Sequence, residues 1–211
     1  ISASREAGNG YRYNTAFKNN KAFYNGRFAS GRENEFQVMA GYVNNDFGAN
    51  GYYAAPGDVE SQEIINTTIA SVGYKAKVSS GWVMTPRISY RHNEDDYRYF
   101  RHDLSRFRNE HSTDVLNAEL NNTITTGIGV FGLGLEGRSE KINSTNQGKR
   151  ERNNFGLFGE YTFDQLHNLV VNVGGYLNYN SDYGWQLFPG FDAGYSLTDS
   201  WKVFATVGTG Q

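Results

Sequence analysis

The chain has 211 residues, no cysteine and a formal net charge of −2 at pH 7. A charge so close to zero argues against nucleic acid as a partner, because proteins that bind nucleic acids usually carry a basic excess. Without cysteine the chain forms neither a disulfide framework nor a thiolate metal site. No apolar run approaches the roughly 18 residues that a transmembrane helix needs.

Apolar and polar residues alternate along the whole chain, and stretches with helical periodicity are missing. A period of two is typical of β-strands with one apolar and one wet face. In chain order we expect about eleven strands, at 1–6, 22–30, 35–43, 64–78, 82–92, 112–125, 128–142, 154–163, 169–180, 186–197 and 201–210. Many exceed the five or six residues usual in globular proteins. The fold class is therefore all-β.

The alternation is clearest near the end of the chain. The residues expected on the apolar face are Leu169, Val171, Val173, Leu187, Phe191, Ala193, Tyr195, Val203 and Ala205. Those expected on the opposite face are Asn172, Asn178, Asp192 and Lys202. We predict that the first face meets lipid and the second a wet lumen.

The connections between these strands alternate in length. The short connections are 31–34, 79–81, 125–127, 164–168 and 198–200; the others are 7–21, 44–63, 93–111 and 143–153, with a brief one at 181–185. Short periplasmic turns and longer extracellular loops are typical of transmembrane β-barrels. We therefore predict an antiparallel up-and-down transmembrane β-barrel with the lipid bilayer as its partner, and assign residues 1–211 to one barrel domain.

Aromatic residues stand beside the short turns, where an interfacial girdle is expected. They are Phe36, Trp82, Tyr161, Phe163 and Trp201. The alternative is that aromatic residues are simply common in strands. Pro189 fits a regular strand poorly, because proline has no N–H to donate, so we expect a bulge or the end of regular pairing there.

No motif predicts an enzyme. GIGVFG (127–132) matches a dinucleotide fingerprint, but apolar residues and glycines alternate after it, which indicates a glycine-rich strand. The four histidines, His92, His102, His111 and His167, lack the spacing of a zinc site. No local arrangement indicates a Ser–His–Asp triad.

Two of the long loops combine aromatic residues with charge or turn chemistry. Residues 93–110 form either a solvated loop or one that contacts a ligand through flat aromatic area and arginine donors. Residues 46–63 expose a tyrosine pair that either binds a ligand or packs against neighbouring loops. The candidate substrate-contacting residues are Asn50, Tyr52, Tyr53, Tyr97, Tyr99 and Arg101; Arg98, Arg106 and Arg108 are further candidate donors. We assign no catalytic or metal-binding residue.

Three motifs, NGYRYNTAF (9–17), DFGANGYYAAPGD (46–58) and ATVGTGQ (205–211), resemble TonB-dependent outer-membrane receptors. The nearest subgroup is the vitamin B12 (cobalamin) receptors of the Bacteroides group and their relatives. The resemblance covers nearly all of the chain, as barrel only. It implies a bacterial outer-membrane location and a barrel of about 22 strands around a plug domain. Eleven strands alone leave two open edges, which a bilayer does not tolerate, so we expect the other strands and the plug to lie outside this chain.

The resemblance also implies energised uptake of a scarce, bulky nutrient, through a TonB complex that contacts the plug. A corrinoid is the first candidate, and an iron chelate such as a siderophore, or haem, is the second. Such relatives order their loops with calcium held by aspartates, but Asn50 stands at the matching position, and a neutral amide lowers calcium affinity. An outer-membrane barrel enzyme, an adhesin and, last, a soluble β-sandwich remain as alternatives.

Overall fold

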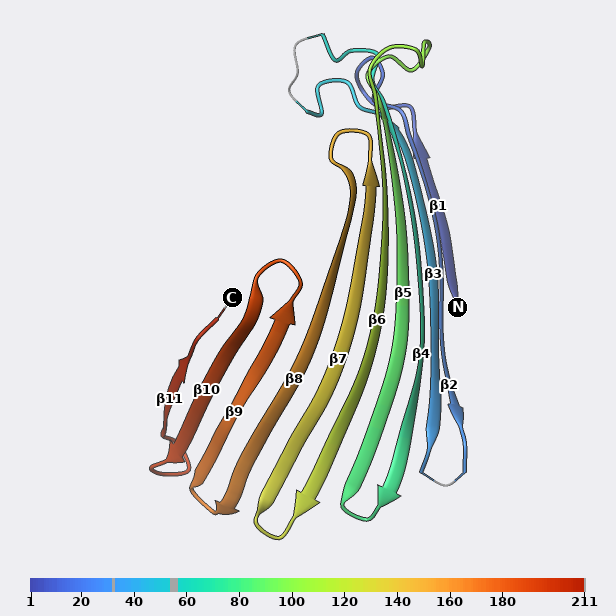
Figure 1. Ribbon diagram of the computed structural model, residues 1–211. Coiled ribbons are helices and arrows are strands. Elements are labelled where there is room, and N and C mark those ends of the chain that lie inside the picture. The colour runs from blue at the N-terminus through green and yellow to red at the C-terminus, as the bar shows by residue number, and fades with distance from the viewer. Residues whose placement is uncertain (32, 54–56, 211) are drawn as a thin grey trace.

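In the computed structural model, which describes residues 1–31, 33–53 and 57–210, the chain forms one antiparallel sheet of eleven strands (Figure 1). The strands are β1 (Ser2–Gly8), β2 (Phe17–Ala29), β3 (Glu35–Gly48), β4 (Gln62–Ser79), β5 (Trp82–Arg98), β6 (Arg108–Thr126), β7 (Gly129–Ser144), β8 (Gly148–Leu166), β9 (Leu169–Asn180), β10 (Gly184–Ser196) and β11 (Lys202–Gly208). Across these described ranges, no helix is long and apolar enough to cross a membrane.

Each strand pairs with the next one along the chain, so the sheet is an up-and-down meander. Alternate connections lie at opposite ends of the strands, as the sequence predicts (Figure 1). At the lower end of Figure 1 the connections are 30–34, 80–81, 127–128, 167–168 and 197–201. At the upper end they are 9–16, 49–61, 99–107, 145–147 and 181–183. The all-β, up-and-down architecture is confirmed.

The strands extend further at their upper ends than the sequence analysis predicted. The expected loop 143–153 is a tight hairpin turn at 145–147, in which Ser144 Oγ accepts hydrogen bonds from the backbone N–H groups of Asn146 (3.2 Å) and Gln147 (3.0 Å). Both faces of these strand ends are polar, and Lys141 pairs with Glu151 across the β7–β8 ladder. Without an apolar face the period-two signal fades although the backbone pairing continues.

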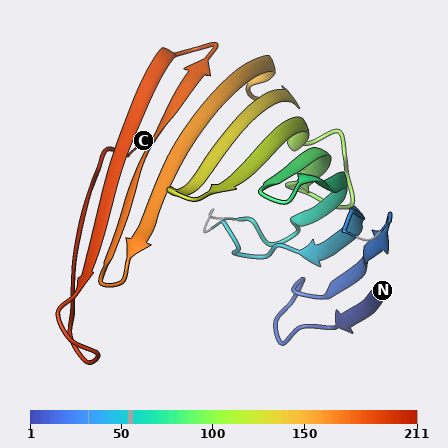
Figure 2. The same ribbon diagram turned by 90° about the horizontal axis from the view of Figure 1, so that it is seen from below.

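The sheet bends into an open arc, and the loop after β3 lies on its inner side (Figure 2). On this concave face, Tyr176 of β9 reaches over β8 and donates a hydrogen bond from its hydroxyl to Glu136 of β7. The side chain crosses directly above Gly156, where a Cβ atom would lie 2.5 Å from the Tyr176 hydroxyl. Glycine at this position therefore lets side chains two strands apart meet across the inner wall.

The two faces of the wall separate as predicted. Val173 pairs with Phe191 and Val171 with Ala193, while Asn172 pairs with Asp192 on the opposite face. The apolar side chains form an exposed band on the convex side, as Leu187 (64 % exposed) and Val203 (56 %) illustrate. Only one hydrophobic side chain among the described residues, Ala49, is buried. A sandwich would bury many, so this wall meets lipid instead of a second sheet.

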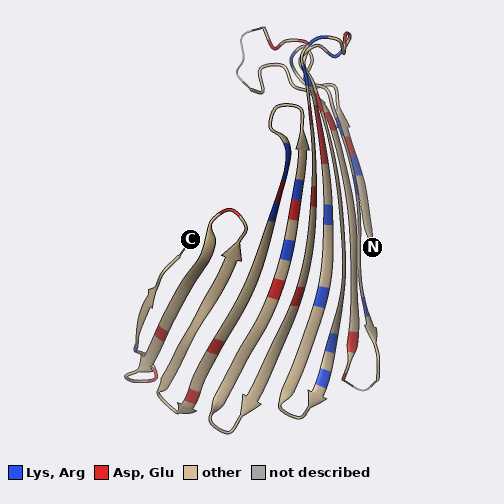
Figure 3. Ribbon diagram, in the orientation of Figure 1, with Lys and Arg blue, Asp and Glu red and all other residues tan. Residues whose placement is uncertain are grey.

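The convex band has an aromatic lower rim and a polar upper rim. At the lower end Phe36 packs on Tyr74 (ring centroids 4.5 Å apart) and Phe131 on Tyr161 (4.6 Å), and Trp82 opens β5. This is the aromatic girdle that the sequence predicts. Above the band, His92 pairs with Asp114 at 2.8 Å. Figure 3, which marks charged residues of both faces, shows many on the upper parts of β5–β8 and none on β9.

Of the two outcomes expected at Pro189, a bulge or the end of regular pairing, the structure shows the second, on one side of the strand. Pro189 pairs with Gly175 of β9 in an unbroken register. On the other side, the β10–β11 pairing ends at Gly190 and Gly208, and Thr209 N donates to the Pro189 carbonyl at 3.2 Å. The N and O atoms of one residue point to the same neighbour in an antiparallel ladder, so the donor missing from proline falls on the β11 side, where pairing ends.

Candidate ligand-binding site

Three upper connections meet above β2–β6 and form one unit, here called the loop cap (residues 9–16, 49–53 with 57–61, and 99–107). Asn14, with a left-handed φ of 53°, is its buried centre. The Asn14 amide donates to the carbonyls of Val59 (2.9 Å) and Ser61 (2.6 Å). Asparagine tolerates this backbone conformation better than most residues, and its side chain joins the first connection to the second.

Arg101 joins the third connection to the other two. Its Nη1 donates to Asn14 Oδ1 at 2.7 Å, and its Nε donates to Glu60 Oε2 at 3.2 Å. Its backbone N–H donates to the Glu60 carbonyl at 2.9 Å. Tyr13 also donates its hydroxyl proton to Glu60. The Tyr13 hydrogen bond and the charge of Arg101 lower the pKa of the Glu60 carboxyl, so the anionic form of Glu60 holds the cap together.

The structure places Asn50 inside the loop cap. Its Nδ2 donates to the Tyr13 carbonyl at 2.6 Å. Tyr52 is 66 % exposed and packs edge-on against Phe47 (5.3 Å) and Tyr53 (4.9 Å). Of the candidate residues, Asn50 and Arg101 thus hold the loops, and Tyr52 begins a series of aromatic contacts.

That series leads into a concavity of about 520 Å³ on the concave face. Its lining, here called the Tyr97 pocket, is Tyr53, Asp95, Tyr97, Tyr99, Phe107, Asn109 and His111. Alternation along β5 puts Asp95 and Tyr97 on one face, and register pairs Asp95 with His111 and Tyr97 with Asn109 of β6. Tyr99 follows the strand, and its N–H donates to the Phe107 carbonyl at 3.0 Å. Tyr53 stands edge-on to Tyr97 at 5.2 Å, and Tyr99 to Phe107 at 6.5 Å. Three candidate residues, Tyr53, Tyr97 and Tyr99, therefore come together here.

Buried carboxylates support the tyrosines from behind. Tyr97 donates its hydroxyl proton to Asp58 Oδ1 at 3.0 Å, and Asp58 is 1 % exposed. Tyr53 donates to both oxygens of Glu63 at 2.7 Å, and Glu63 is 3 % exposed. These groups lie in the cap and at the upper ends of β4 and β5 in Figure 1, above the apolar convex band. Burial and the bond to Asp58 raise the pKa of Tyr97 to about 12. Burial raises the pKa of the Glu63 carboxyl, and the nearby Asp95 raises it further. The hydrogen bond from Tyr53 acts in the opposite direction but is weaker than these two effects together.

The arginines of residues 93–110 do not line this pocket. Arg98 and Arg108 hold Asp96 on the opposite face of the wall, at 2.6 Å and 2.7 Å. Arg106 lies over the Phe100 ring at 4.8 Å. Sequence reasoning missed Asp95, Asn109 and His111, although the alternation 95–97–99 could have revealed the first of them.

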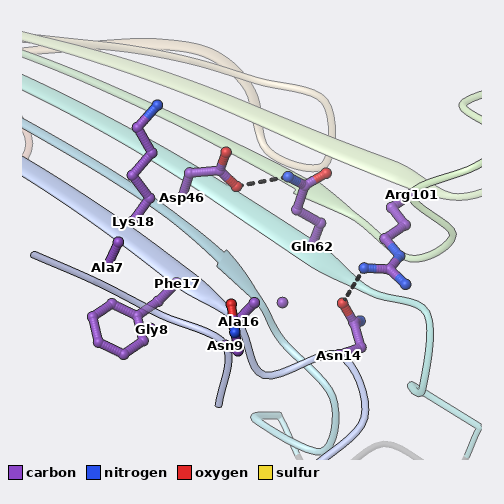
Figure 4. Close-up of a pocket in the computed structure, with 11 residues that line it drawn as sticks. Ala7, Gly8, Asn9, Asn14, Ala16, Phe17, Lys18, Asp46, Gln62 and Arg101 are labelled. Carbon is purple, nitrogen blue, oxygen red and sulfur yellow. Dashed lines mark hydrogen bonds between the residues drawn. The ribbon is translucent and has the colours of Figure 1, made fainter.

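A second concavity, of about 420 Å³, opens near β1–β4 (Figure 4). Arg101 and Asn14 approach it from the loop cap, joined by the hydrogen bond drawn in Figure 4. On its other side Gln62 donates to Asp46 Oδ1 at 2.6 Å, and Lys18 extends beside them. Its polar lining is shared between the cap and the strand ends, so Arg101 belongs to this concavity and not to the Tyr97 pocket.

Within the described ranges, no group of three or more His, Asp or Glu side chains is arranged to hold a metal ion. Asp46 and Asp58 are the two aspartates nearest the tyrosine pair in sequence, and each has a different hydrogen-bond partner. Asp46 accepts a hydrogen bond from Gln62, and Asp58 accepts one from Tyr97. The calcium ligands of the resembled receptors therefore have no assembled counterpart among these residues.

No family model and no curated protein matches this sequence. Solved structures do match its fold. The siderophore receptor PirA from Pseudomonas aeruginosa aligns with 92 % of the chain (TM-score 0.73, 15 % identity, 33 % of that protein's length). The ferric citrate transporter FecA aligns with 97 % (TM-score 0.74, 14 % identity, 37 % of its length). The copper transporter OprC aligns with 97 % (TM-score 0.74, 13 % identity, 38 % of its length).

All three are receptors or transporters, and none of the three names mentions a corrinoid. The chain spans between 33 % and 38 % of their lengths, so it corresponds to part of such a barrel. Together with the apolar convex band, this fold is that of a β-barrel wall in a bacterial outer membrane. The chain has the fold of part of the barrel wall of the TonB-dependent receptors that its motifs resemble.

Proposed function

We propose that the chain is part of the wall and extracellular vestibule of an energised uptake receptor for a scarce, bulky nutrient. The observation that carries this proposal is the Tyr97 pocket, which opens on the concave face directly beneath the loop cap. A nutrient too large for a porin requires a concave, aromatic-rich receptor surface with a few polar groups. The proposed ligand contacts are Tyr53, Tyr97 and Tyr99, with Tyr52 beside them.

Two substrate classes fit this surface. The motif resemblance supports a corrinoid, because the tyrosine pair stands where the cobalamin receptors carry theirs. The names of the structurally similar proteins support an iron chelate, since one of the three cited above is a siderophore receptor and another is a ferric citrate transporter. Both classes are bulky and present flat or polar surfaces of the kind that tyrosine rings contact.

We further propose that the rest of the barrel and a plug domain lie outside residues 1–211. Both edge strands, β1 and β11, have one neighbour each, and unpaired strand edges are not tolerated in a bilayer. The plug is the element through which a TonB complex would act on the receptor, so this partner would not contact the part of the wall described here.

Calcium has a smaller role in this proposal than in the cobalamin receptors. Arg101 already connects the three loops through Asn14 and Glu60. A guanidinium with several directed hydrogen bonds can perform the cross-linking that a bound cation performs elsewhere. We therefore propose that ligand binding does not depend on calcium.

The test is equilibrium binding to the purified full-length receptor in detergent, with and without a chelator of divalent cations. Cyanocobalamin, ferric citrate, ferric enterobactin and haem are titrated separately. The proposal predicts saturable binding of at least one probe with a Kd of about 1 µM or below, unchanged by the chelator. A Tyr97→Ala/Tyr99→Ala double variant should bind more weakly, whereas Tyr11→Ala, an 88 % exposed tyrosine outside the pocket, should not. Absence of saturable binding for all four probes would reject the proposal.

A further inference from the structure

We propose that the Tyr97 pocket recognises a neutral or cationic, donor-rich face of the ligand and disfavours polyanionic chelates. This inference rests on the proposed function and adds to it the charge class of the substrate. It follows from where period-two alternation places the charged residues at the upper ends of β5 and β6.

The alternation places the arginines of these strand ends on one face of the wall and Asp95 on the other. Asp95 shares the concave face with Tyr97, while the next residues in sequence, Asp96 and Arg98, are on the convex face. The Asp96 carboxylate holds Arg98 at 2.6 Å and Arg108 at 2.7 Å there. Both arginines of these strand ends are thus directed away from the pocket, and the acidic Asp95 is directed into it.

The loop cap directs no arginine into the pocket either. Arg101 is bound to Asn14 and Glu60, Arg106 lies over the Phe100 ring and Arg12 lies over the Tyr11 ring. None of these three arginines lines the pocket. The second connection of the cap contains no lysine or arginine. The pocket lining contains no lysine or arginine, and its histidine, His111, contacts Ser144 Oγ through Nδ1 at 2.8 Å. A polyanion in this pocket would therefore meet no guanidinium or ammonium partner among the described residues that line it.

The tyrosine hydroxyls also offer acceptors in preference to donors. Tyr97 has its single hydroxyl proton engaged by Asp58, and Tyr53 has its proton engaged by Glu63. Each phenol oxygen is left with lone pairs only. Asp95 also lines the pocket, with its Oδ1 atom buried and without a hydrogen-bond partner among the described residues. A ligand with N–H or O–H groups matches the two phenol oxygens, and a carboxylate or catecholate oxygen does not.

The aromatic rings favour the same class of ligand. The faces of Tyr97, Tyr99 and Phe107 carry the negative side of the ring quadrupole, which attracts ammonium and polarised N–H groups. The buried Asp58 carboxylate behind the Tyr97 ring adds negative potential. Neutral amide-bearing ligands and cationic chelates satisfy the pocket, so the inference favours a corrinoid or a cationic iron chelate over ferric citrate and ferric enterobactin.

The first test measures the pocket's potential without any nutrient. A cysteine replaces Asn109 in the full-length receptor, free of other accessible cysteines, and a control cysteine replaces Asn146 in the exposed β7–β8 turn. Each is modified with a trimethylammonium methanethiosulfonate and with a sulfonate methanethiosulfonate. We expect the cationic-to-anionic rate ratio at position 109 to exceed the ratio at position 146 by about tenfold or more. Asp95→Asn should lower that excess, and Asp103→Asn, in the exposed loop, should leave it unchanged.

A ratio at position 109 equal to or below the ratio at position 146 would overturn the inference. The second test uses the binding panel, extended with ferrioxamine B, a cationic iron chelate. Tighter binding of ferric citrate or ferric enterobactin than of ferrioxamine B and cyanocobalamin would overturn the charge class while the uptake function stands. No binding of any probe, with the cationic preference at position 109 intact, would reject the uptake function and leave the charge class standing.

Discussion

Tyr97 and Arg98 are neighbours in sequence and act on opposite sides of the wall. Tyr97 donates to the buried Asp58 on the concave side, and Arg98 holds Asp96 on the convex side. Adjacent residues of a strand always point to opposite faces. Here that rule separates an aromatic, acidic pocket from an arginine-rich outer surface within two residues, and a one-residue shift in register would exchange the two surfaces.

The orientation of the lower wall predicts a contrast between adjacent substitutions. Val173→Arg puts a charge on the lipid face, where Val173 is 48 % exposed, and should cost about 2–4 kcal/mol near the midplane. Asn172→Arg, one residue away on the lumen face, should cost far less. The measurement is the free energy of folding of the full-length receptor into lipid vesicles, from denaturant titration. Equal costs would contradict the assigned faces.

Asn178 also faces the concave side, but its side chain is only 3 % exposed. An arginine there would displace packed neighbours as well as enter the lumen. Asn172 is therefore the better control for the lumen face.

The alternation of connections predicts the topology across the membrane. Cysteines at Ser105 and Asn146 should react with an impermeant reagent on intact cells, and cysteines at Ser80 and Asp199 should react only after lysis. All four positions are exposed, so burial does not confound the comparison. Asp58, an obvious choice from the sequence, is unsuitable because it is 1 % exposed. Labelling of Ser80 or Asp199 on intact cells would contradict the topology.

The loop cap predicts that one arginine controls the mobility of distant loops. Arg101→Ala removes hydrogen bonds to Asn14 and Glu60, each of a kind worth about 1.5–3 kcal/mol. Backbone hydrogen exchange in 9–16 and 57–61 should accelerate about tenfold or more. Arg106→Ala, which removes an arginine stacked on Phe100, is the matched control and should leave those segments unchanged. Unaltered exchange in the Arg101 variant would exclude the cross-link.

The same cross-link predicts loosening of the cap in acid. The folded-state pKa of Glu60 lies below its ordinary value of 4.5. A lowered carboxyl pKa stabilises the folded state above the ordinary value, and this contribution is lost as pH falls through the lowered value. A spin label at the exposed Leu104 should become more mobile on acidification through this range. In the Glu60→Gln variant the spin label should be mobile already at neutral pH and should change little on acidification. If that variant shows the same acid transition, the transition belongs to another group.

Much of the fold could be predicted from the sequence because the lower wall has one lipid-facing and one wet face. Strand β9 was predicted with its observed bounds, Leu169–Asn180, since its apolar side chains alternate with asparagine, glycine and tyrosine. The upper strand ends could not be predicted as well, because both faces are wet there and backbone pairing leaves no pattern in hydropathy.

The candidate site was only partly predictable for a related reason. Aromatic density marks Tyr53, Tyr97 and Tyr99, which meet in one pocket. The interaction of Arg101 with Asn14 joins residues 87 positions apart in sequence, and no local pattern reveals such a contact. Asn50 similarly resembles a ligand position in sequence, but in the structure it contacts the Tyr13 carbonyl.

The most direct test of the uptake account is accumulation of labelled cyanocobalamin, ferrioxamine B and ferric citrate by cells with and without the intact receptor gene. The account predicts saturable accumulation of at least one of them that needs the receptor, stops when a protonophore collapses the proton-motive force, and falls in a Tyr97→Ala/Tyr99→Ala strain with normal receptor abundance. Accumulation that is independent of the receptor, or that continues after the proton-motive force has collapsed, would contradict it.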